Sequence, residues 1–128
     1  MKRLILLFLA VILLTACGQY TEKDQGAVYV NITAEEAKQI MDSEEGYIIL
    51  DVRTKEEYDQ GHIPSAILIP NTEIETKAEE VLTDKDQQIL VYCRSGRRSK
   101  IAAEALVELG YTNIKEFGGI IDWPYETE

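Results

Sequence analysis

The sequence has 128 residues, of which 45 % are hydrophobic and 28 % are charged, so it fits one globular domain and not a disordered chain. Its formal net charge of −10 argues against nucleic-acid binding, because contacts to phosphates need a basic surface. Two cysteines and one histidine argue against a disulfide-rich scaffold and against a zinc site built on several imidazoles; we expect no metal and no cofactor.

The chain begins with a segment typical of a secretion signal. Residues 1–3 are a short basic stretch, and residues 4–14 are all apolar. An apolar run of this length suits a signal peptide, whereas a membrane-spanning helix needs about 20 residues. Two small residues and Cys17 follow, which resembles the lipobox of bacterial lipoproteins. We expect residues 1–16 to be removed and Cys17 to be lipidated; the alternatives are a plain signal peptide with an incidental cysteine, or an uncleaved anchor.

A lipidated Cys17 would tether the protein to a membrane outside the cytoplasm, since a diacyl anchor holds stably where one chain does not. Removing residues 1–16 deletes two basic residues and no acidic one, which changes the net charge from −10 to −12. Cys93 would then be the single thiol of the mature protein, and we expect it to be exposed. Residues 17–27 form a polar tether in this interpretation, and residues 28–128 form the domain.

Short apolar runs alternate with helical patterns along the domain. Two capping boxes, Thr33–Glu36 and Thr54–Glu57, each predict the start of a helix, and further helices are expected over residues 74–82 and 99–109. Strands are expected at residues 28–32, 47–50, 66–69, 88–92 and 114–117. About five strands and about five helical segments in alternation predict an α/β domain with a central, mainly parallel five-stranded sheet and helices on both faces. Ligands of such sheets bind at the carboxyl ends of the strands.

The loop after the fourth predicted strand carries the most chemistry. It can wrap around the sulfur of Cys93 with its N–H groups pointing inward, and Gly96 permits the positive φ that a tight cradle requires. Its three arginines and the following helix N-terminus favour a thiolate, and such settings lower a cysteine pKa from about 8.5 to between roughly 3.5 and 7.5. The loop consists of Cys93, Arg94, Ser95, Gly96, Arg97, Arg98 and Ser99.

A less specific interpretation is a buried structural cysteine beside a solvated basic turn. Two observations count against it. The loop holds three positive charges although the protein as a whole is negatively charged. Cys93 also stands at the carboxyl end of the apolar strand rather than within it.

Two further stretches, one before the loop and one after it, complete a pattern. Residues 49–66 include Asp51 and Arg53 after a strand and then the turn Gly-His-Ile-Pro-Ser-Ala, and residues 117–123 read Phe-Gly-Gly-Ile-Ile-Asp-Trp. Together with the Cys93 loop, these stretches resemble the rhodanese-like sulfurtransferases, in this order and over roughly residues 28–125. Ser65 stands where glycine is commoner in that family.

The resemblance implies a reaction. The Cys93 thiolate attacks the outer sulfur of a small anionic donor such as thiosulfate, sulfite leaves, and a Cys93 persulfide passes its sulfur to a thiol, a protein acceptor or cyanide. The N–H groups from Arg94 to Ser99 would cradle the outer sulfur. Arg97 and Arg98 are expected to attract the sulfonate, and the sequence does not say which arginine faces the substrate.

The length of the loop separates two branches of this superfamily. Phosphatase and arsenate-reductase relatives place an arginine at the sixth position after the cysteine, in a wider loop that fits a tetrahedral oxyanion. Here that position holds Ser99, and Arg98 lies one position earlier. The shorter loop suits a single sulfur atom and argues against phosphatase activity.

Other candidates have structural alternatives. Asp51 and Arg53 either brace the Cys93 loop or form a buried structural ion pair, and the structural role is favoured. His62 is a possible general base, but no paired acid is evident and a structural role in its turn is favoured. Trp123 and Tyr125 are expected to pack near the chain end, with walling of the active site as the alternative.

Three functions follow from these observations. The first is a membrane-anchored sulfurtransferase that acts through a Cys93 persulfide. The second is a sulfur-carrier or thiol-redox module that exchanges sulfur with a protein partner and turns over little free thiosulfate. The third is a pseudo-enzyme that only binds, and the intact cysteine and arginines argue against it.

Overall fold

The computed structural model describes residues 28–128. The expected signal peptide, the lipidated Cys17 and the tether lie outside the described residues. The described elements are β1 (Val30–Asn31), α1 (Ala34–Ser43), β2 (Ile48–Asp51), α2 (Lys55–Asp59), β3 (Ile67–Leu68), α3 (Ile74–Val81), β4 (Ile89–Cys93), α4 (Arg97–Glu108) and β5 (Ile114–Gly119), with single 3-10 turns η1 (Asn71–Glu73) and η2 (Ile120–Asp122).

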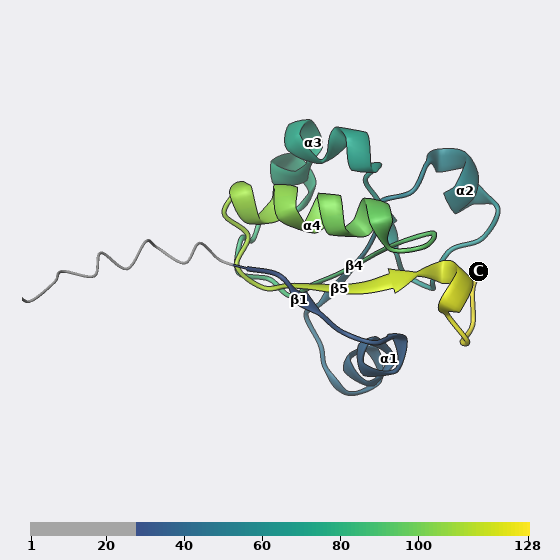
Figure 1. Ribbon diagram of the computed structural model, residues 1–128. Coiled ribbons are helices and arrows are strands. Elements are labelled where there is room, and N and C mark those ends of the chain that lie inside the picture. The colour runs from purple at the N-terminus through teal and green to yellow at the C-terminus, as the bar shows by residue number, and fades with distance from the viewer. Residues whose placement is uncertain (1–27) are drawn as a thin grey trace, which may run out of the picture.

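The five strands form one sheet in the order β1-β5-β4-β2-β3, and every pairing in it is parallel. Helices α3 and α4 cover one face, α1 covers the other, and α2 lies beside the carboxyl ends of the strands (Figure 1). The predicted α/β architecture is therefore confirmed. Among residues 28–128, no helix combines the length and the apolarity that crossing a membrane requires.

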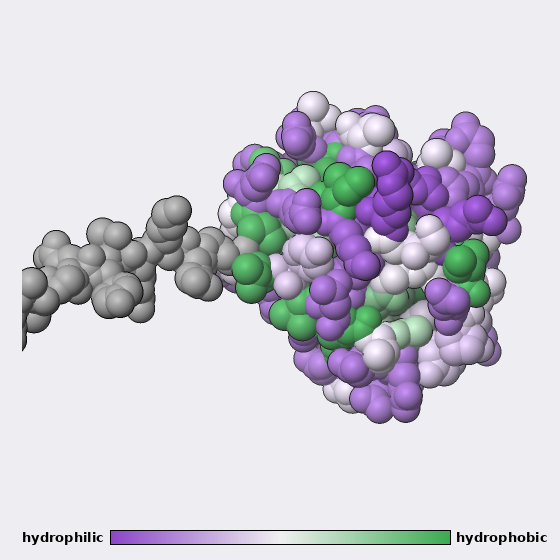
Figure 2. All heavy atoms as spheres, in the orientation of Figure 1, coloured by the Kyte–Doolittle hydropathy of each residue, from purple (hydrophilic) through white to green (hydrophobic). Residues whose placement is uncertain are grey.

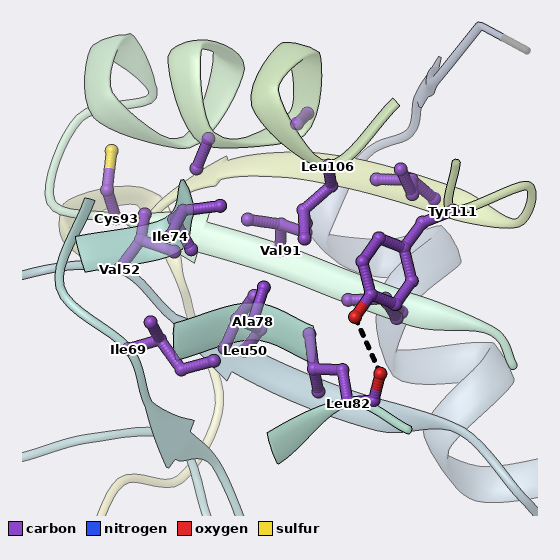
Figure 3. Close-up of a cluster of buried hydrophobic side chains, with 14 residues drawn as sticks. Leu50, Val52, Ile69, Ile74, Ala78, Leu82, Val91, Cys93, Leu106 and Tyr111 are labelled. Carbon is purple, nitrogen blue, oxygen red and sulfur yellow. Dashed lines mark hydrogen bonds between the residues drawn. The ribbon is translucent and has the colours of Figure 1, made fainter. Parts of the chain in front are cut away.

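Strand β4 occupies the centre of the sheet and contributes to two apolar layers. All five of its residues are buried. Ile89, Val91 and Cys93 pack in the layer under α3 and α4, and Leu90 and Tyr92 pack in the layer on the α1 side, as the period of two requires. Figure 3 shows the first layer, with Cys93 at its margin and its sulfur directed toward the first turn of α4. The core thus fixes the position of the thiol.

The sequence located both capping boxes, but it placed the start of α4 too late. The Thr33 and Thr54 hydroxyls accept the N–H groups of Glu36 and Glu57 at 3.0 and 3.3 Å, and α2 has the full reciprocal box. The last helix was expected over residues 99–109 and runs from Arg97 to Glu108 instead. The left-handed Gly96, at φ +104°, turns the chain within three residues, so no polar N-cap marks this helix in the sequence.

Candidate active site

Strand β4 delivers Cys93 to its carboxyl end, and only residues 94–96 separate it from α4. The Cys93 side chain was expected to be exposed, but the residue is only 1 % exposed. The Gly96 N–H donates a hydrogen bond to Cys93 Sγ at 3.0 Å, and the Ser99 hydroxyl lies 3.3 Å from the same sulfur. The thiol is therefore buried because its own loop closes around it.

Hydrogen bonds decide the ionisation of this thiol. Burial by itself raises the pKa of Cys93, since a buried charge is poorly solvated. Hydrogen bonds to the sulfur outweigh this effect and hold the pKa of Cys93 below its ordinary value. They come from the hydroxyl and N–H of Ser99 and from the N–H groups of Gly96 and Ser95. The N-terminus of α4 adds a positive partial charge close to the sulfur. The loop therefore stabilises a thiolate in a place that excludes water.

The paired glycines near the end of the chain allow β5 to approach this loop. Val91 pairs with Glu116 but Cys93 pairs with Gly119, so β5 holds one extra residue in a bulge, and Gly118 there has φ +87°. A Cβ on Gly119 would lie 1.9 Å from the carbonyl oxygen of Arg94, a distance that no structure tolerates. Glycine at position 119 is thus required by close backbone contact with the active-site loop.

Glu116 is a residue of this site that the sequence analysis missed. It is 2 % exposed, and its Oε1 lies 2.6 Å from the Ser99 hydroxyl and accepts the Gly118 N–H at 2.8 Å. A signal was present in the sequence. Glu116 lies two positions after Ile114 in a predicted strand, so both side chains are expected on the same, core-facing side. The Ser99 hydroxyl thus lies between the thiol and a buried acid.

The three loop arginines have different surroundings. Arg98 forms a two-pronged ion pair with Glu57 of α2, at 2.6 and 2.9 Å. That hydrogen bonding lowers the pKa of Glu57 to about 2. Arg94 and Arg97 are both exposed, but Arg94 also lines a cavity of about 310 Å³ beside the loop. The other lining residues are Arg53, Glu57, Gln60, Gly61, Ile120, Ile121 and Thr127.

Asp51 and Arg53 form a buried ion pair next to this cavity. Arg53 Nη2 lies 2.7 Å from Asp51 Oδ2 and also donates to the Gly61 carbonyl at 2.7 Å. The Tyr92 hydroxyl donates to the same Asp51 oxygen at 2.6 Å, and burial followed by this carboxylate raises the pKa of Tyr92. Each charge in the group thus has a partner of opposite charge or a hydrogen bond.

His62 also lies in a closed set of contacts. Its ring stacks on Tyr58 with centroids 3.9 Å apart, and its Nδ1 lies 3.0 Å from the Tyr58 carbonyl oxygen. The acid that the sequence did not reveal is Glu128, whose Oε1 lies 3.4 Å from Nε2. The main chains of His62 and Glu128 also exchange two hydrogen bonds. These contacts hold the turn against the C-terminal segment.

Trp123 and Tyr125 line a different cavity from the one beside the loop. That cavity, of about 480 Å³, also contacts α1 through Met41 and has no Cys93-loop residue in its wall. The Trp123 ring packs against the rings of Phe117 and Tyr125, with centroids 5.6 and 4.9 Å away. Within residues 28–128, no group of three or more His, Cys, Asp or Glu side chains is arranged to hold a metal ion.

The sequence of residues 33–124 matches that of rhodanese-like domains. The chain belongs to this family. The rhodanese-like chain is 37 % identical over 112 residues to "Putative sulfur carrier protein YrkF" of Bacillus subtilis (strain 168), which covers 87 % of this chain and 59 % of that protein. It thus spans little more than half of YrkF.

Two further relatives are shorter. The chain is 41 % identical over 73 residues to "Thiosulfate sulfurtransferase PspE" of Escherichia coli (strain K12), covering 57 % of this chain and 70 % of that protein. A solved structure described as a rhodanese with anions from E. coli superposes with a TM-score of 0.60 at 36 % identity, covering 64 % of this chain and 96 % of that one. Relatives of this rhodanese-like chain are therefore named both as sulfurtransferases and as a sulfur carrier.

Proposed function

We propose that this rhodanese-like protein is a sulfurtransferase that carries sulfane sulfur as a persulfide on Cys93. The observation that carries the proposal is the closed loop around Cys93 Sγ, in which the sulfur accepts the Gly96 N–H and contacts the Ser99 hydroxyl. Donors arranged in this way stabilise a negative charge on sulfur before and after transfer. A small loop fits one sulfur atom better than a tetrahedral oxyanion.

The proposed reaction has two displacement steps. The Cys93 thiolate attacks the outer sulfur of thiosulfate, the S–S bond of the donor breaks, and sulfite leaves with the electron pair. The transferred sulfur then carries the negative charge as Cys93–S–S⁻ and lies among the N–H groups of the loop. An acceptor thiolate or cyanide attacks this outer sulfur, and Cys93 leaves as the thiolate with which the cycle began.

Arg94 is our choice for the residue that binds the anionic end of the donor. Arg98 is held by Glu57, and Arg97 does not line the cavity beside the loop, whereas Arg94 does. The E. coli structure is described as a rhodanese with anions, which supports an anionic ligand for this chain. The sequence-based expectation of a lipidated Cys17 would place this chemistry at a membrane surface outside the cytoplasm.

The test is the intact mass of the protein before and after excess thiosulfate. We expect a gain of about 32 Da, one sulfur atom, which cyanide removes. The variant C93S should show no gain, and C17S should gain sulfur as the wild type does, so the pair assigns the sulfur to one cysteine. A gain that persists in C93S would overturn the proposal.

A protein acceptor is the second candidate, and one surface feature favours it. Ile120 and Ile121 line the cavity beside Arg94, Ile121 is 60 % exposed, and Figure 2 shows a hydrophobic patch over η2. Exposed apolar side chains beside a reactive group suit contact with another protein. In that case the chain is a sulfur carrier, as the name of YrkF describes that relative. A protein that gains sulfur from a persulfide donor but not from thiosulfate would favour the carrier.

A further inference from the structure

The Ser99 hydroxyl lies within hydrogen-bond distance of several groups, but it has only one proton to donate. It lies 2.6 Å from Glu116 Oε1, 3.0 Å from the Gly96 carbonyl oxygen and 3.3 Å from Cys93 Sγ. A hydroxyl donates one hydrogen bond and accepts others. The shortest contact has the length of a charge-assisted O–H···O⁻ bond, so Ser99 donates to Glu116 and accepts from the Cys93 thiol. In this arrangement the sulfur is protonated.

A reactive thiolate requires the opposite arrangement. The Ser99 hydroxyl helps to lower the pKa of Cys93 only when it donates to the sulfur. Its bond to Glu116 must then run the other way, with the carboxyl as donor. Both hydrogen bonds reverse together, and this reversal moves one proton from Cys93 to Glu116.

The surroundings of Glu116 favour the neutral, protonated form of its carboxyl group. Glu116 is 2 % exposed, and no Lys, Arg or His of residues 28–128 forms an ion pair with it. A buried, unpaired carboxylate is costly in free energy. A thiolate one hydroxyl group away would be a second negative charge in the same buried place, and two such charges oppose each other. One negative charge shared between the two groups avoids both costs.

We propose that Glu116 is the internal proton acceptor for Cys93, acting through the Ser99 hydroxyl. The S–H bond of Cys93 breaks as its proton binds Ser99 Oγ, and the original Ser99 proton binds Glu116 Oε1. The negative charge moves from carboxylate to sulfur, and no proton is exchanged with solvent. Glu116 is a positioning residue in this scheme, since Ser99 and not Glu116 contacts the sulfur. The proposal rests on the proposed function only in taking Cys93 as the nucleophile.

Few other titratable or charged groups face this hydrogen-bond chain. Tyr29, ahead of β1, is close enough that Glu116 contributes to its raised pKa, after burial and Glu104. Arg98, on α4 with Ser99, is influenced by the Cys93 charge, but its guanidinium is held by Glu57. Neither Tyr29 nor Arg98 makes a hydrogen bond to Cys93, Ser99 or Glu116 among the described residues.

The rate of Cys93 alkylation by iodoacetamide, measured against pH, reports the thiolate fraction without any sulfur donor. The tryptic peptide of residues 86–94 reports Cys93 separately from Cys17 in the full chain. We expect two steps with a plateau between them, because the pair shares one proton over a range of pH. E116Q should give a single step: its amide oxygen keeps the contacts with Ser99 and Gly118 but cannot bind the proton.

The matched control is E104Q, which removes the same charge from an exposed position on α4 and should keep both steps. S99A is the second variant and answers the question if E116Q does not fold. It removes the hydroxyl that joins the two groups, so the lower step should lose most of its amplitude. A single step in the wild type, or two unchanged steps in E116Q or S99A, would overturn the relay. Failure to gain sulfur from thiosulfate would leave these profiles unchanged, so the two proposals fail separately.

Discussion

At the scale of single residues, three arginines with the same charge have different roles. Arg94 lines the cavity beside the Cys93 loop, Arg98 is bound to Glu57, and Arg97 is exposed and does not line that cavity. If Arg94 binds the sulfonate, R94A removes a charge-assisted hydrogen bond, worth about 1.5–3 kcal/mol. We expect the KM for thiosulfate to rise about tenfold or more, with a smaller change in kcat. Steady-state kinetics of R94A beside R97A would test this.

R97A is the control for the loss of one positive charge from the same loop. Its KM should change less than about twofold, because Arg97 does not line the cavity beside the loop and its exposed charge would act on the donor only through solvent. A larger rise in KM for R97A than for R94A would contradict the assignment. It would mean that Arg97, one of the two residues expected from the sequence, binds the sulfonate.

The sequence predicted the residues of the site that follow local rules and missed those set by tertiary contact. Cys93 at a strand end and Gly96 at a positive φ are local features, and both are found as expected. The partnership of Arg98 with Glu57 joins segments 41 residues apart, and the position of Glu116 behind Ser99 joins segments 17 residues apart. The alternation of inward and outward side chains along β5 indicated that Glu116 faces the core. It did not indicate that Glu116 would contact the Ser99 hydroxyl.

At the scale of elements, the Glu57–Arg98 pair joins α2 to the first turn of α4. The two side chains are 25 % and 28 % exposed, and the hydrogen bonds from Arg98 lower the pKa of Glu57 from 4.5 to about 2. A lowered folded-state pKa stabilises the protein above pH 4.5, and this contribution disappears as the pH falls toward 2. We expect E57Q to lower the free energy of unfolding at pH 7 by about 2 kcal/mol, less than full linkage because the pair is partly exposed.

Urea unfolding of the wild type and E57Q between pH 7 and pH 3 would measure this difference. It should shrink as the pH falls, since Glu57 becomes protonated in both the folded and the unfolded wild type. E56Q is the control, because Glu56 is exposed on the same helix and no arginine pairs with it among the described residues. A difference that stays constant with pH would mean that Glu57 stabilises α2 as a cap and not through its charge.

The predicted elements agreed best where one local signal was strong. Both capping boxes located a helix start, and the apolar runs located all five strands. The edge strands β1 and β3 are only two residues long, shorter than the runs expected there, and short edge strands leave few unpaired backbone groups exposed. The N-cap of α4 is Gly96, which has no side chain to cap the helix, so the start of α4 lacks the polar signal found at α1 and α2.

At the scale of the whole molecule, charge acts against an anionic substrate. The chain carries a net charge of −10, whereas the positive charges close to the site are the three arginines of the Cys93 loop and Arg53, which lines the same cavity as Arg94. The screening length falls from about 30 Å at 0.01 M salt to about 10 Å at 0.1 M. Added salt therefore removes the long-range repulsion from distant carboxylates before it removes the attraction of an arginine a few ångströms from the substrate.

Two alkylating reagents of similar size separate this effect from the reactivity of the thiol. Iodoacetate is an anion and iodoacetamide is neutral, and both react with the Cys93 thiolate. We expect the ratio of their rates at Cys93, iodoacetate over iodoacetamide, to rise roughly twofold to fivefold between 0.01 M and 0.1 M salt. The neutral reagent removes any change that salt makes to the pKa of Cys93. A ratio that falls with salt would mean that the loop arginines attract anions beyond the screening length, so that the acidic surface does not limit capture of the donor.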